Sequence, residues 1–275
     1  MKKKGFTLIE LLVIIAIIGM LSSVILVNLS GTRERAKISQ GLSFSQSMNN
    51  ALGAYLVGIW SLDKINPDNT VIDASGYNNN CISSGPVEDD GIMRKALSFD
   101  GVNDYLNCGN QLSLSASDAL TIEAWVFDRA PSESYEYIVS NDRDCCGAYK
   151  GYSLFINQNK VRFQIWDSSS VQRRVSSLQS ISANTWYHIA GTFDGNKMSI
   201  YINGNLDNSL NFIGTIGTPA SYNLAIGGLG YSPANYNING KIDEVRIYGE
   251  ALIAGEIKKH YAEGLKKHKL TIVNR

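Results

Sequence analysis

The first thirty residues carry the feature that most constrains this chain: a long uncharged apolar segment behind a basic head. Lysines occupy positions 2–4, and no charged residue occurs between Glu10 and Arg33. A segment of about 20 apolar residues is long enough to cross the hydrocarbon core of a membrane. Because the lysines precede it, the positive-inside rule predicts a single-pass precursor in the cytoplasmic membrane with its N-terminus inside.

Glu10 is the residue that an ordinary membrane anchor would not contain. A carboxylate within an apolar helix costs about 2.5–3.5 kcal/mol near the bilayer centre and less near the interface, so such a charge is normally retained for a partner. The run Gly-Phe-Thr-Leu-Ile-Glu over residues 5–10, together with the basic leader and the apolar segment, resembles the processing motif of type IV prepilins and type II secretion pseudopilins. The resemblance implies cleavage between Gly5 and Phe6 by a prepilin peptidase, N-methylation of Phe6, and packing of the mature helix into a filament.

Physical chemistry is consistent with that motif. Gly5 lacks a Cβ, which lets the backbone extend into a protease cleft. Cleavage removes the leader and leaves an ammonium group on Phe6, to which Glu10 of a neighbouring subunit can pair, so that the buried charge sets the register of assembly. A secretory signal peptide would need a small-residue cleavage site after the apolar run, and none is evident at residues 22–30.

Composition limits the remaining possibilities. The 275 residues include 25 basic and 25 acidic side chains, giving a formal net charge of zero. That balance argues against a nucleic-acid-binding surface and against a strongly electrostatic partner. The length accommodates one short N-terminal element and one β-sandwich of about 200 residues.

Four cysteines, at positions 81, 108, 145 and 146, lie in the part of the chain expected outside the membrane, where disulfides can form. No C-x-x-C pair is present, which disfavours a zinc site. Four cysteines allow three full pairings. A vicinal bridge between Cys145 and Cys146 would be strained, so Cys81–Cys108 is the favoured pair, with free thiols as the alternative.

The sequence predicts a leader at residues 1–5 and one helix over residues 6–56, with no proline before Pro67. At 1.5 Å per residue this helix would be a rod of roughly 75 Å. Its first part, residues 6–32, is apolar all round, whereas residues 33–56 alternate with helical period and are amphipathic.

After residue 56 the period changes from helical to alternating. Apolar residues at 120, 122, 124 and 126 alternate with their neighbours, and hairpin signals of the Asp-Gly and Asn-Gly type occur at 194–196 and 203–205. Many short strands without interleaved helices predict an antiparallel sandwich over residues 57–264. Further strands are expected at residues 152–156, 161–166, 186–193, 198–202 and 242–248, followed by a short C-terminal helix at 251–262 and a loose tail at 265–275.

Several separate blocks of this second part look like the laminin-G-like module of the concanavalin A-like lectin/glucanase superfamily. The blocks are residues 59–63, 73–80, 96–105, 120–126, 186–195, 201–204 and 240–248. The resemblance implies a jelly roll of two curved antiparallel sheets, often with a bound calcium and with glycan or protein ligands. It covers nearly everything after the predicted rod.

The resemblance also suggests a calcium site. Asp100 and Asp243 match acidic positions associated with calcium in related modules, and Asn103 or Asp104 could add oxygen ligands. Calcium takes about six to eight oxygens, so backbone carbonyls would complete the set. The alternative is structural: Asp100 caps a turn before Gly101, and Asp243 pairs with Arg246 or a backbone amide.

Catalysis is not expected. Glucanases of the superfamily place two carboxylates on one strand face, and retaining hydrolysis needs them about 5–5.5 Å apart. Glu123 has no acidic residue two positions away, and the adjacent Asp243 and Glu244 point to opposite faces of a strand. His188 is expected in the core. For ligand binding, the Gly- and Asn-rich stretch 227–237 with Tyr231 and Tyr236 is the most suitable candidate, with a plain surface connection as the alternative.

Together these features predict a type IV pilin-like subunit that displays an extracellular laminin-G-like binding head for adhesion or for recognition of a glycan or protein. The expected partners are the prepilin peptidase, other pilin subunits and a membrane assembly platform, without nucleic acid. The expected final location is a cell-surface filament. Two alternatives remain: a pseudopilin of a type II secretion or DNA-uptake machine, and a structural subunit whose head has no ligand.

Overall fold

The computed structural model describes residues 8, 12, 15, 55–143, 149–218, 222–230, 232 and 236–273, with backbone only for 143 and 267–273. The chain divides into two units, Met1–Ala54 and Tyr55–Arg275. In the first unit Leu8, Leu12 and Ile15 are helical and exposed. The rest of the predicted rod and of its membrane-spanning part lies outside the described residues. Among the helices that the structure does describe, none is both long and apolar enough to cross a membrane.

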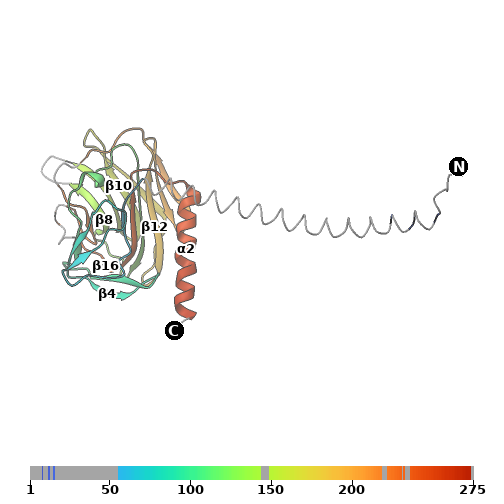
Figure 1. Cartoon of the computed structure of the whole chain (residues 1–275). Helices are drawn as coiled ribbons and strands as arrows, with labels where there is room; N and C mark the ends of the chain where they lie inside the picture. The colour runs from blue at the N-terminus through green and yellow to red at the C-terminus, as the bar shows by residue number, and fades with distance from the viewer. Residues whose placement is uncertain are drawn as a thin grey trace. The chain divides into compact units, whose positions relative to one another are not determined.

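The second unit, which we call the head, is the predicted sandwich of two antiparallel sheets (Figure 1). The first sheet contains, in spatial order, β14 (Asn205–Asn211), β13 (Lys197–Ile202), β12 (Trp186–Phe193), β7 (Leu120–Asp128), β16 (Asn239–Tyr248), β5 (Lys95–Asp100) and β4 (Val87–Asp90), with β1 (Leu56–Trp60) also paired to β16. The second sheet contains β11 (Gln172–Ser180), β10 (Lys160–Trp166), β9 (Lys150–Asn157), β8 (Glu136–Arg143), β15 (Ala225–Ile226), β6 (Tyr105–Asn107), β3 (Cys81–Ser84) and β2 (Thr70–Val71).

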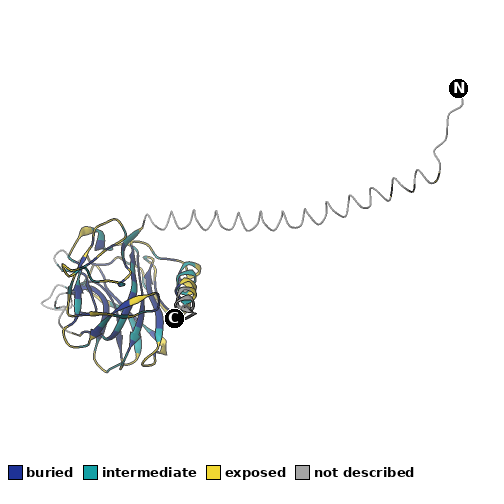
Figure 2. Cartoon of the chain, turned by 60° about the horizontal axis from the view of Figure 1, so that its bottom comes forward, coloured by how far each residue is buried: buried dark blue, intermediate teal, exposed yellow. Residues whose placement is uncertain are grey.

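The core lies between the two sheets, where Figure 2 shows the buried residues in dark blue. Strand β7 illustrates how the alternating pattern produces it. Leu120, Ile122 and Val126 belong to the main core, whereas Trp125 belongs to a second apolar cluster that includes Ile92 and packs against α2. Both faces of β7 are therefore covered, and the predicted strands at 120–126, 152–156, 161–166, 186–193, 198–202 and 242–248 are confirmed.

The head has its own core and its own covalent link. Every residue of the main core lies between Trp60 and Ile247. Cys81, at the start of β3, and Cys108, directly after the neighbouring strand β6, form a disulfide, which is the pair favoured from the sequence. Cys145 and Cys146 lie outside the described residues. A closed core and an internal disulfide support treating residues 55–275 as an independently folding domain.

The predicted end of the rod at residue 56 is wrong. Tyr55 lies in a turn, and Leu56 already begins β1, which pairs with Tyr248 of β16. The β-branched Val57 and Ile59 favour this strand, and Trp60 fixes it by donating its indole N–H to the carbonyl of Asn79 at 3.0 Å. The amphipathic pattern of the preceding segment continues to residue 56, but Leu56 pairs with a neighbouring strand and therefore belongs to the sheet.

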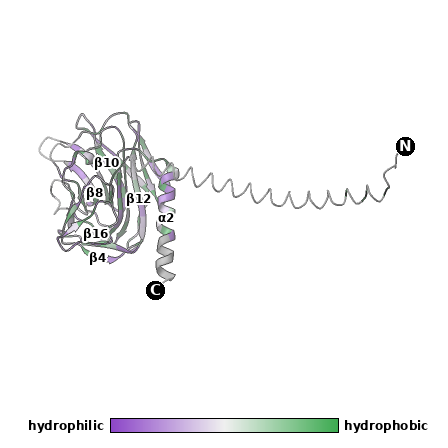
Figure 3. Ribbon diagram, in the orientation of Figure 1, coloured by the Kyte–Doolittle hydropathy of each residue, from purple (hydrophilic) through white to green (hydrophobic). Residues whose placement is uncertain are grey.

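The predicted C-terminal helix is placed correctly but its ends are wrong. Helix α2 spans Ala254–Val273, so the tail expected at residues 265–275 is helical as far as Val273. It begins after Ile253 because Glu256 accepts a hydrogen bond from the backbone N–H of Ile253 at 2.9 Å, as in a capping box. It continues because no proline or further glycine follows Gly264. Figure 3 shows hydrophilic residues, in purple, in the upper part of α2.

Gly264 sets how closely α2 approaches the first sheet. A Cβ at this position would lie 2.6 Å from the Trp125 ring, whereas a Cβ at Gly255, also in α2, would meet no atom within 4 Å. Alanine is favoured over glycine within a helix by about 1 kcal/mol, but overpacking an apolar contact costs about 1–3 kcal/mol. At Gly264 the contact with Trp125 therefore determines how an added Cβ changes stability. At Gly255 helix propensity determines it.

Gly264→Ala is expected to lower the free energy of unfolding of the head by about 1–2 kcal/mol. Gly255→Ala, the matched control, is expected to leave it unchanged or to raise it by up to about 1 kcal/mol. Thermal unfolding followed by circular dichroism measures both. A Gly264→Ala head as stable as the wild type would show that the Trp125 ring moves aside without cost.

Candidate functional site

Two hollows lie at opposite ends of the sandwich. Strands β7 and β16 run side by side in opposite directions, pairing Thr121 with Tyr248 at one end and Asp128 with Gly240 at the other. A nine-residue strand such as β7 is about 27 Å long. The chain enters the head at Tyr55, whose carbonyl accepts a hydrogen bond from Gly249. We call the end near Tyr55 proximal and the other end distal.

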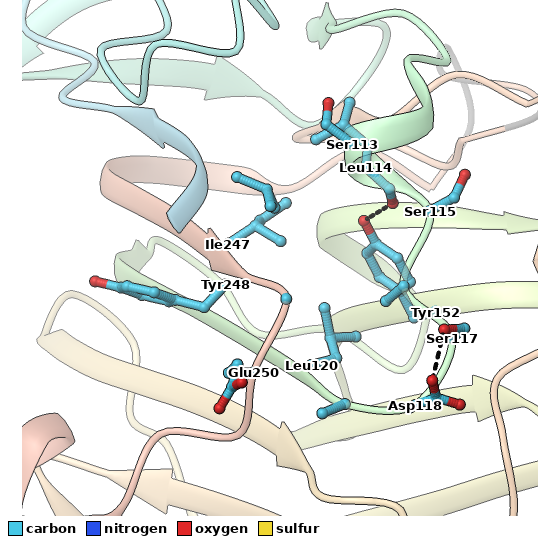
Figure 4. Close-up of a pocket in the computed structure, with 14 residues that line it drawn as sticks. Ser113, Leu114, Ser115, Ser117, Asp118, Leu120, Tyr152, Ile247, Tyr248 and Glu250 are labelled. Atoms are coloured by element: carbon cyan, nitrogen blue, oxygen red, sulfur yellow. Dashed lines mark hydrogen bonds between the residues drawn. The ribbon is translucent and has the colours of Figure 1, made fainter. Parts of the chain in front are cut away.

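The proximal hollow has a volume of about 340 Å³ and is bordered by the segment 113–120, by Tyr152 and by residues 247–250 (Figure 4). Its aromatic residues are unavailable for stacking. Tyr152 is buried and donates its hydroxyl to the carbonyl of Leu114 at 2.7 Å, and Tyr248 is also buried. The rest of the wall combines three serines with apolar residues such as Val57, Leu120 and Ile247, so among its lining residues no exposed aromatic ring is offered to a ligand.

The distal hollow has a volume of about 330 Å³ and combines polar and aromatic residues. Tyr236 is 51% exposed there and has a left-handed backbone, with φ of 56°. A bulky residue in that conformation costs free energy and persists only where its surroundings fix it. Its carbonyl is held by the N–H of Tyr137 at 2.9 Å. The nine lining residues are Gly101, Ala130, Ser132, Ser134, Tyr135, Glu136, Tyr236, Asn237 and Asn239.

The ring of Tyr236 packs against an aromatic cluster. The Tyr236 ring centroid lies 5.9 Å from that of Tyr135 and 6.3 Å from that of Tyr137. Phe155 completes the cluster at 5.0 Å from Tyr137. Because Tyr137 and Phe155 are buried, they hold the two outer tyrosines in place. Rings held in this way can stack on an apolar face of a ligand with little loss of side-chain entropy.

Glu136 lines the distal hollow, and the carboxyl group of Asp128 lies behind it. Glu136, at the start of β8, and Asp128, at the end of β7, are both buried and hydrogen-bonded to each other. Glu136 Oε2 also accepts the N–H of Ser132 at 3.2 Å, and Asp128 Oδ1 accepts that of Ala130 at 2.9 Å. Burial and the adjacent Asp128 charge raise the pKa of Glu136 to about 7, and burial raises the pKa of Asp128.

The predicted ligand-binding residues have separate outcomes. Tyr236 lies in the distal hollow, whereas Tyr231 lies outside the described residues. Glu136 is the acidic residue among the lining residues of this site. Its partner Asp128 carried no sequence signal, because the two meet only where the ends of two strands from different sheets come together.

The residues of the predicted calcium site do not form one group. Asp100 Oδ1 accepts the N–H groups of Val102 and Asn103, at 2.8 and 3.3 Å, and Asp104 Oδ2 accepts that of Asp100 at 2.9 Å. These bonds close a turn that borders the distal hollow through Gly101. The turn matches the structural alternative, in which Asp100 caps the chain before Gly101.

Asp243 lies away from that turn. Asn239 stands opposite Asp100 in the pairing of β16 with β5, and Asp243 is four residues further along β16, which is about 13 Å. Asp243 Oδ2 instead accepts the N–H groups of Ile92 and Met93, at 2.9 and 3.2 Å, and burial raises the pKa of Asp243 to about 8. Within the described residues, no three acidic, histidine or cysteine side chains are grouped as a metal site would require.

A buried ionic cluster on the outer face of the first sheet was missed from the sequence. Glu123, expected to stand alone, contacts Nδ1 of His260 in α2 at 2.8 Å, Nη1 of Arg246 at 3.3 Å and Nε2 of His188 at 3.6 Å. Burial opposes ionisation of Glu123, but the His260 contact and the charges of His260 and Arg246 outweigh it and lower its pKa to about 2. The cluster is largely buried and joins α2 to the sheet.

Comparisons with known proteins agree with this fold. A family profile described as the concanavalin A-like lectin/glucanases superfamily matches residues 100–258. The chain belongs to this superfamily. A second profile, the prokaryotic N-terminal methylation motif, matches residues 1–26, so the concanavalin A-like head follows a pilin-type N-terminus. Both resemblances seen in the sequence are thereby confirmed.

Curated relatives match one part or the other. The type IV major pilin protein PilE1 of Neisseria gonorrhoeae is 33% identical over 116 residues, 42% of this chain and 52% of that protein. The type II secretion system core protein G of Escherichia coli is 43% identical over 54 residues, 20% of this chain and 37% of that protein. The N,N-dimethylformamidase beta subunit of Paracoccus aminophilus is 26% identical over 180 residues, 55% of this chain and 23% of that protein. The chain thus spans about half or less of these relatives.

Solved structures share the fold of the head. The binding domain of Paraclostridial Mosquitocidal Protein 1 has a TM-score of 0.63 at 19% identity, covering 76% of this chain and 52% of that one. Domain 4 of AbnA, an extracellular arabinanase of Geobacillus stearothermophilus, was solved in complex with arabinotriose and has a TM-score of 0.59 at 18% identity. The match covers 74% of this chain and 97% of that domain, so this fold exists as an isolated domain.

Proposed function

We propose that the protein is a type IV pilin-like filament subunit whose concanavalin A-like head binds a carbohydrate in the distal hollow. The N-terminal motif and the pilin relatives support assembly with other pilin subunits. In this proposal a prepilin peptidase cuts between Gly5 and Phe6, a membrane platform extracts the helix, and Glu10 pairs with the Phe6 amine of a neighbouring subunit. The mature subunit then presents its head on the cell surface.

The observation that carries the binding proposal is the exposed, strained Tyr236 in a hollow that also offers polar groups. Saccharides present apolar C–H faces and hydroxyl edges, so they need an aromatic ring beside hydrogen-bonding side chains. Tyr236 and Tyr135 supply the rings, and Asn239, Ser132 and Ser134 lie beside them. The hollow is at the end of the head away from Tyr55.

The related folds support the same assignment. The arabinanase domain was solved with arabinotriose, and other similar domains are described as binding domains. We assign the head to binding rather than to catalysis. Calcium stays part of the proposal as a possible ligand of the turn at Asp100 to Asp104, where backbone carbonyls would have to supply most of the oxygens. Measuring binding with calcium and then with a chelator tests that part.

Tyr236→Ala is expected to weaken saccharide binding by the isolated head by at least about tenfold, because the mutation removes the exposed stacking surface. Binding is measured on an oligosaccharide array and then by titration with the best ligand. Tyr77→Ala is the control, since Tyr77 is exposed to a similar extent, 49%, but does not line the hollow. Saccharide binding that is unchanged in Tyr236→Ala would place the site elsewhere on the head.

The alternative is a pseudopilin of a secretion machine, which the 43% identity to core protein G over 54 residues favours. That identity covers 20% of this chain. Deleting the gene separates the two functions. Loss of adhesion to a saccharide-coated surface with normal secretion supports the proposal, and loss of protein secretion supports the pseudopilin.

A further inference from the structure

Glu136 is the group that gives the distal hollow its electrostatic character. Among the nine lining residues it is the acidic one, and lysine, arginine and histidine do not occur. Behind it, Asp128 Oδ2 is buried and accepts no hydrogen bond from an amide or hydroxyl of the described residues. Its neighbour is the Glu136 carboxyl, with which it shares a hydrogen bond. Burial and the neighbouring carboxyl raise the pKa of Glu136 to about 7, so Glu136 gains its negative charge as the pH rises through neutrality.

The surrounding cations do not neutralise this charge at the hollow. The guanidinium of Arg129 donates to the carbonyl of Phe99 at 2.9 Å and to that of Gly240 at 3.3 Å. Arg174 donates to Gln164 Oε1 at 2.6 Å and lies over the Phe155 ring at 5.4 Å. Neither arginine lines the hollow. The other charged groups of the neighbouring turns are acidic, namely Asp100, Asp104 and Glu133.

An anionic ligand would therefore meet an uncompensated carboxylate of the same sign in a partly desolvated site. Like charges at short range in a low-dielectric environment repel strongly. None of the nine lining residues is a cation that could offset this repulsion by attracting the ligand. A neutral saccharide avoids this repulsion, and its hydroxyl groups can donate hydrogen bonds to carboxylate oxygens. The tyrosine rings favour either ligand equally, so charge decides between them.

We infer that the Asp128–Glu136 carboxyl pair makes the distal hollow selective for neutral saccharides and excludes those that carry carboxylate or sulfate groups. Glu136 is the specificity-determining residue. The inference rests on the proposed function, because it names the ligand class of the same site.

The test compares neutral oligosaccharides, including arabinotriose and galactose-, glucose- and mannose-based chains, with their sialylated or sulfated counterparts. The isolated head, residues 55–275, is used. Wild-type protein is expected to bind each anionic counterpart at least about tenfold more weakly than its neutral parent. In Glu136→Gln this gap between neutral and anionic saccharides is expected to narrow to about threefold or less. Glu250→Gln makes the same change at a residue of the proximal hollow and is expected to preserve the gap.

A pH series on wild-type protein provides a test without a mutation. The gap is expected to widen as the pH rises from about 6 to 8, because Glu136 loses its proton near pH 7 while sialic acid and sulfate stay charged throughout. A gap that is flat over this range overturns the role of Glu136, even if the Glu136→Gln head fails to fold.

The remaining outcomes separate the two proposals. A wild-type head that binds anionic and neutral saccharides equally, while Tyr236→Ala abolishes binding, overturns the selectivity and retains the binding function. A gap that is unchanged in a folded Glu136→Gln head also overturns the inference. A folded head that binds no saccharide at all overturns the binding function and the inference with it.

Discussion

Gly5→Val is expected to leave the chain as an unprocessed precursor that retains the five-residue leader and lacks the N-methyl group on Phe6. The physical reason is steric. Glycine has no Cβ and can extend into a protease cleft, whereas a β-branched side chain adds bulk and stiffness at the residue whose bond is cut. Because the retained leader carries three lysines, the uncut helix cannot leave the membrane for the filament.

Intact-mass measurement of the membrane fraction distinguishes the precursor from the mature subunit, and electron microscopy or surface labelling measures assembly. Gly31→Val is the matched control, because it makes the same change in the N-terminal segment at a position outside residues 5–10. A Gly5→Val chain that still begins at a methylated Phe6 would show that this motif is not the site of processing, and the assembly mechanism would lose its basis.

The fold of the head was predictable because it depends on local patterns. The alternation over residues 120–126 marks a strand wherever it pairs, and turn signals at residues 194–196 and 203–205 fix the neighbouring hairpin. The ends of elements were less predictable. Leu56 was assigned to the helix because the apolar pattern around it is compatible with either a helix or a strand. Its pairing with Tyr248 makes it part of a strand.

The binding site was only partly predictable because its residues come from separate parts of the chain. Tyr236 stood out as an aromatic residue in a Gly- and Asn-rich stretch, but its support comes from Tyr135, which is a hundred residues earlier in the chain. The carboxyl pair had no signal at all, since Asp128 and Glu136 belong to strands in different sheets. A sequence reader can recognise pairs of acids two residues apart on one strand, but not pairs created by the packing of two strand ends.

The same limitation concealed the cluster around Glu123, where a large effect on stability is expected. Glu123 lies opposite Arg246 in the pairing of β7 with β16, and His260 reaches it from α2. Arg246 is largely buried, with 14% of its side chain exposed, and the charges of Glu123 and Glu244 raise its pKa even though burial opposes this. Removing Glu123 would leave a buried guanidinium with Glu244 as its remaining acidic contact and would remove a contact that holds α2 to the sheet.

Glu123→Ala is expected to lower the free energy of unfolding of the head by about 3–5 kcal/mol, the usual cost of breaking a buried ion pair from one side. For a domain of this size the melting temperature would fall by about 6–20 °C. Thermal unfolding measures the change, and Glu133→Ala, at an exposed acidic residue, is expected to change the melting temperature by no more than a degree or two.

A double mutant separates the ion pair from packing. If the charge of Arg246 is what becomes uncompensated, then Glu123→Ala combined with Arg246→Met will be less destabilised than the sum of the two single changes, by about 1–3 kcal/mol. Additive losses would mean that Glu123 acts through packing of its side chain and that the charges contribute little. Hydrogen exchange of the amides in α2 then shows whether the loss begins at the helix. Faster exchange there than in β12 is expected, because His260 is the contact that α2 loses.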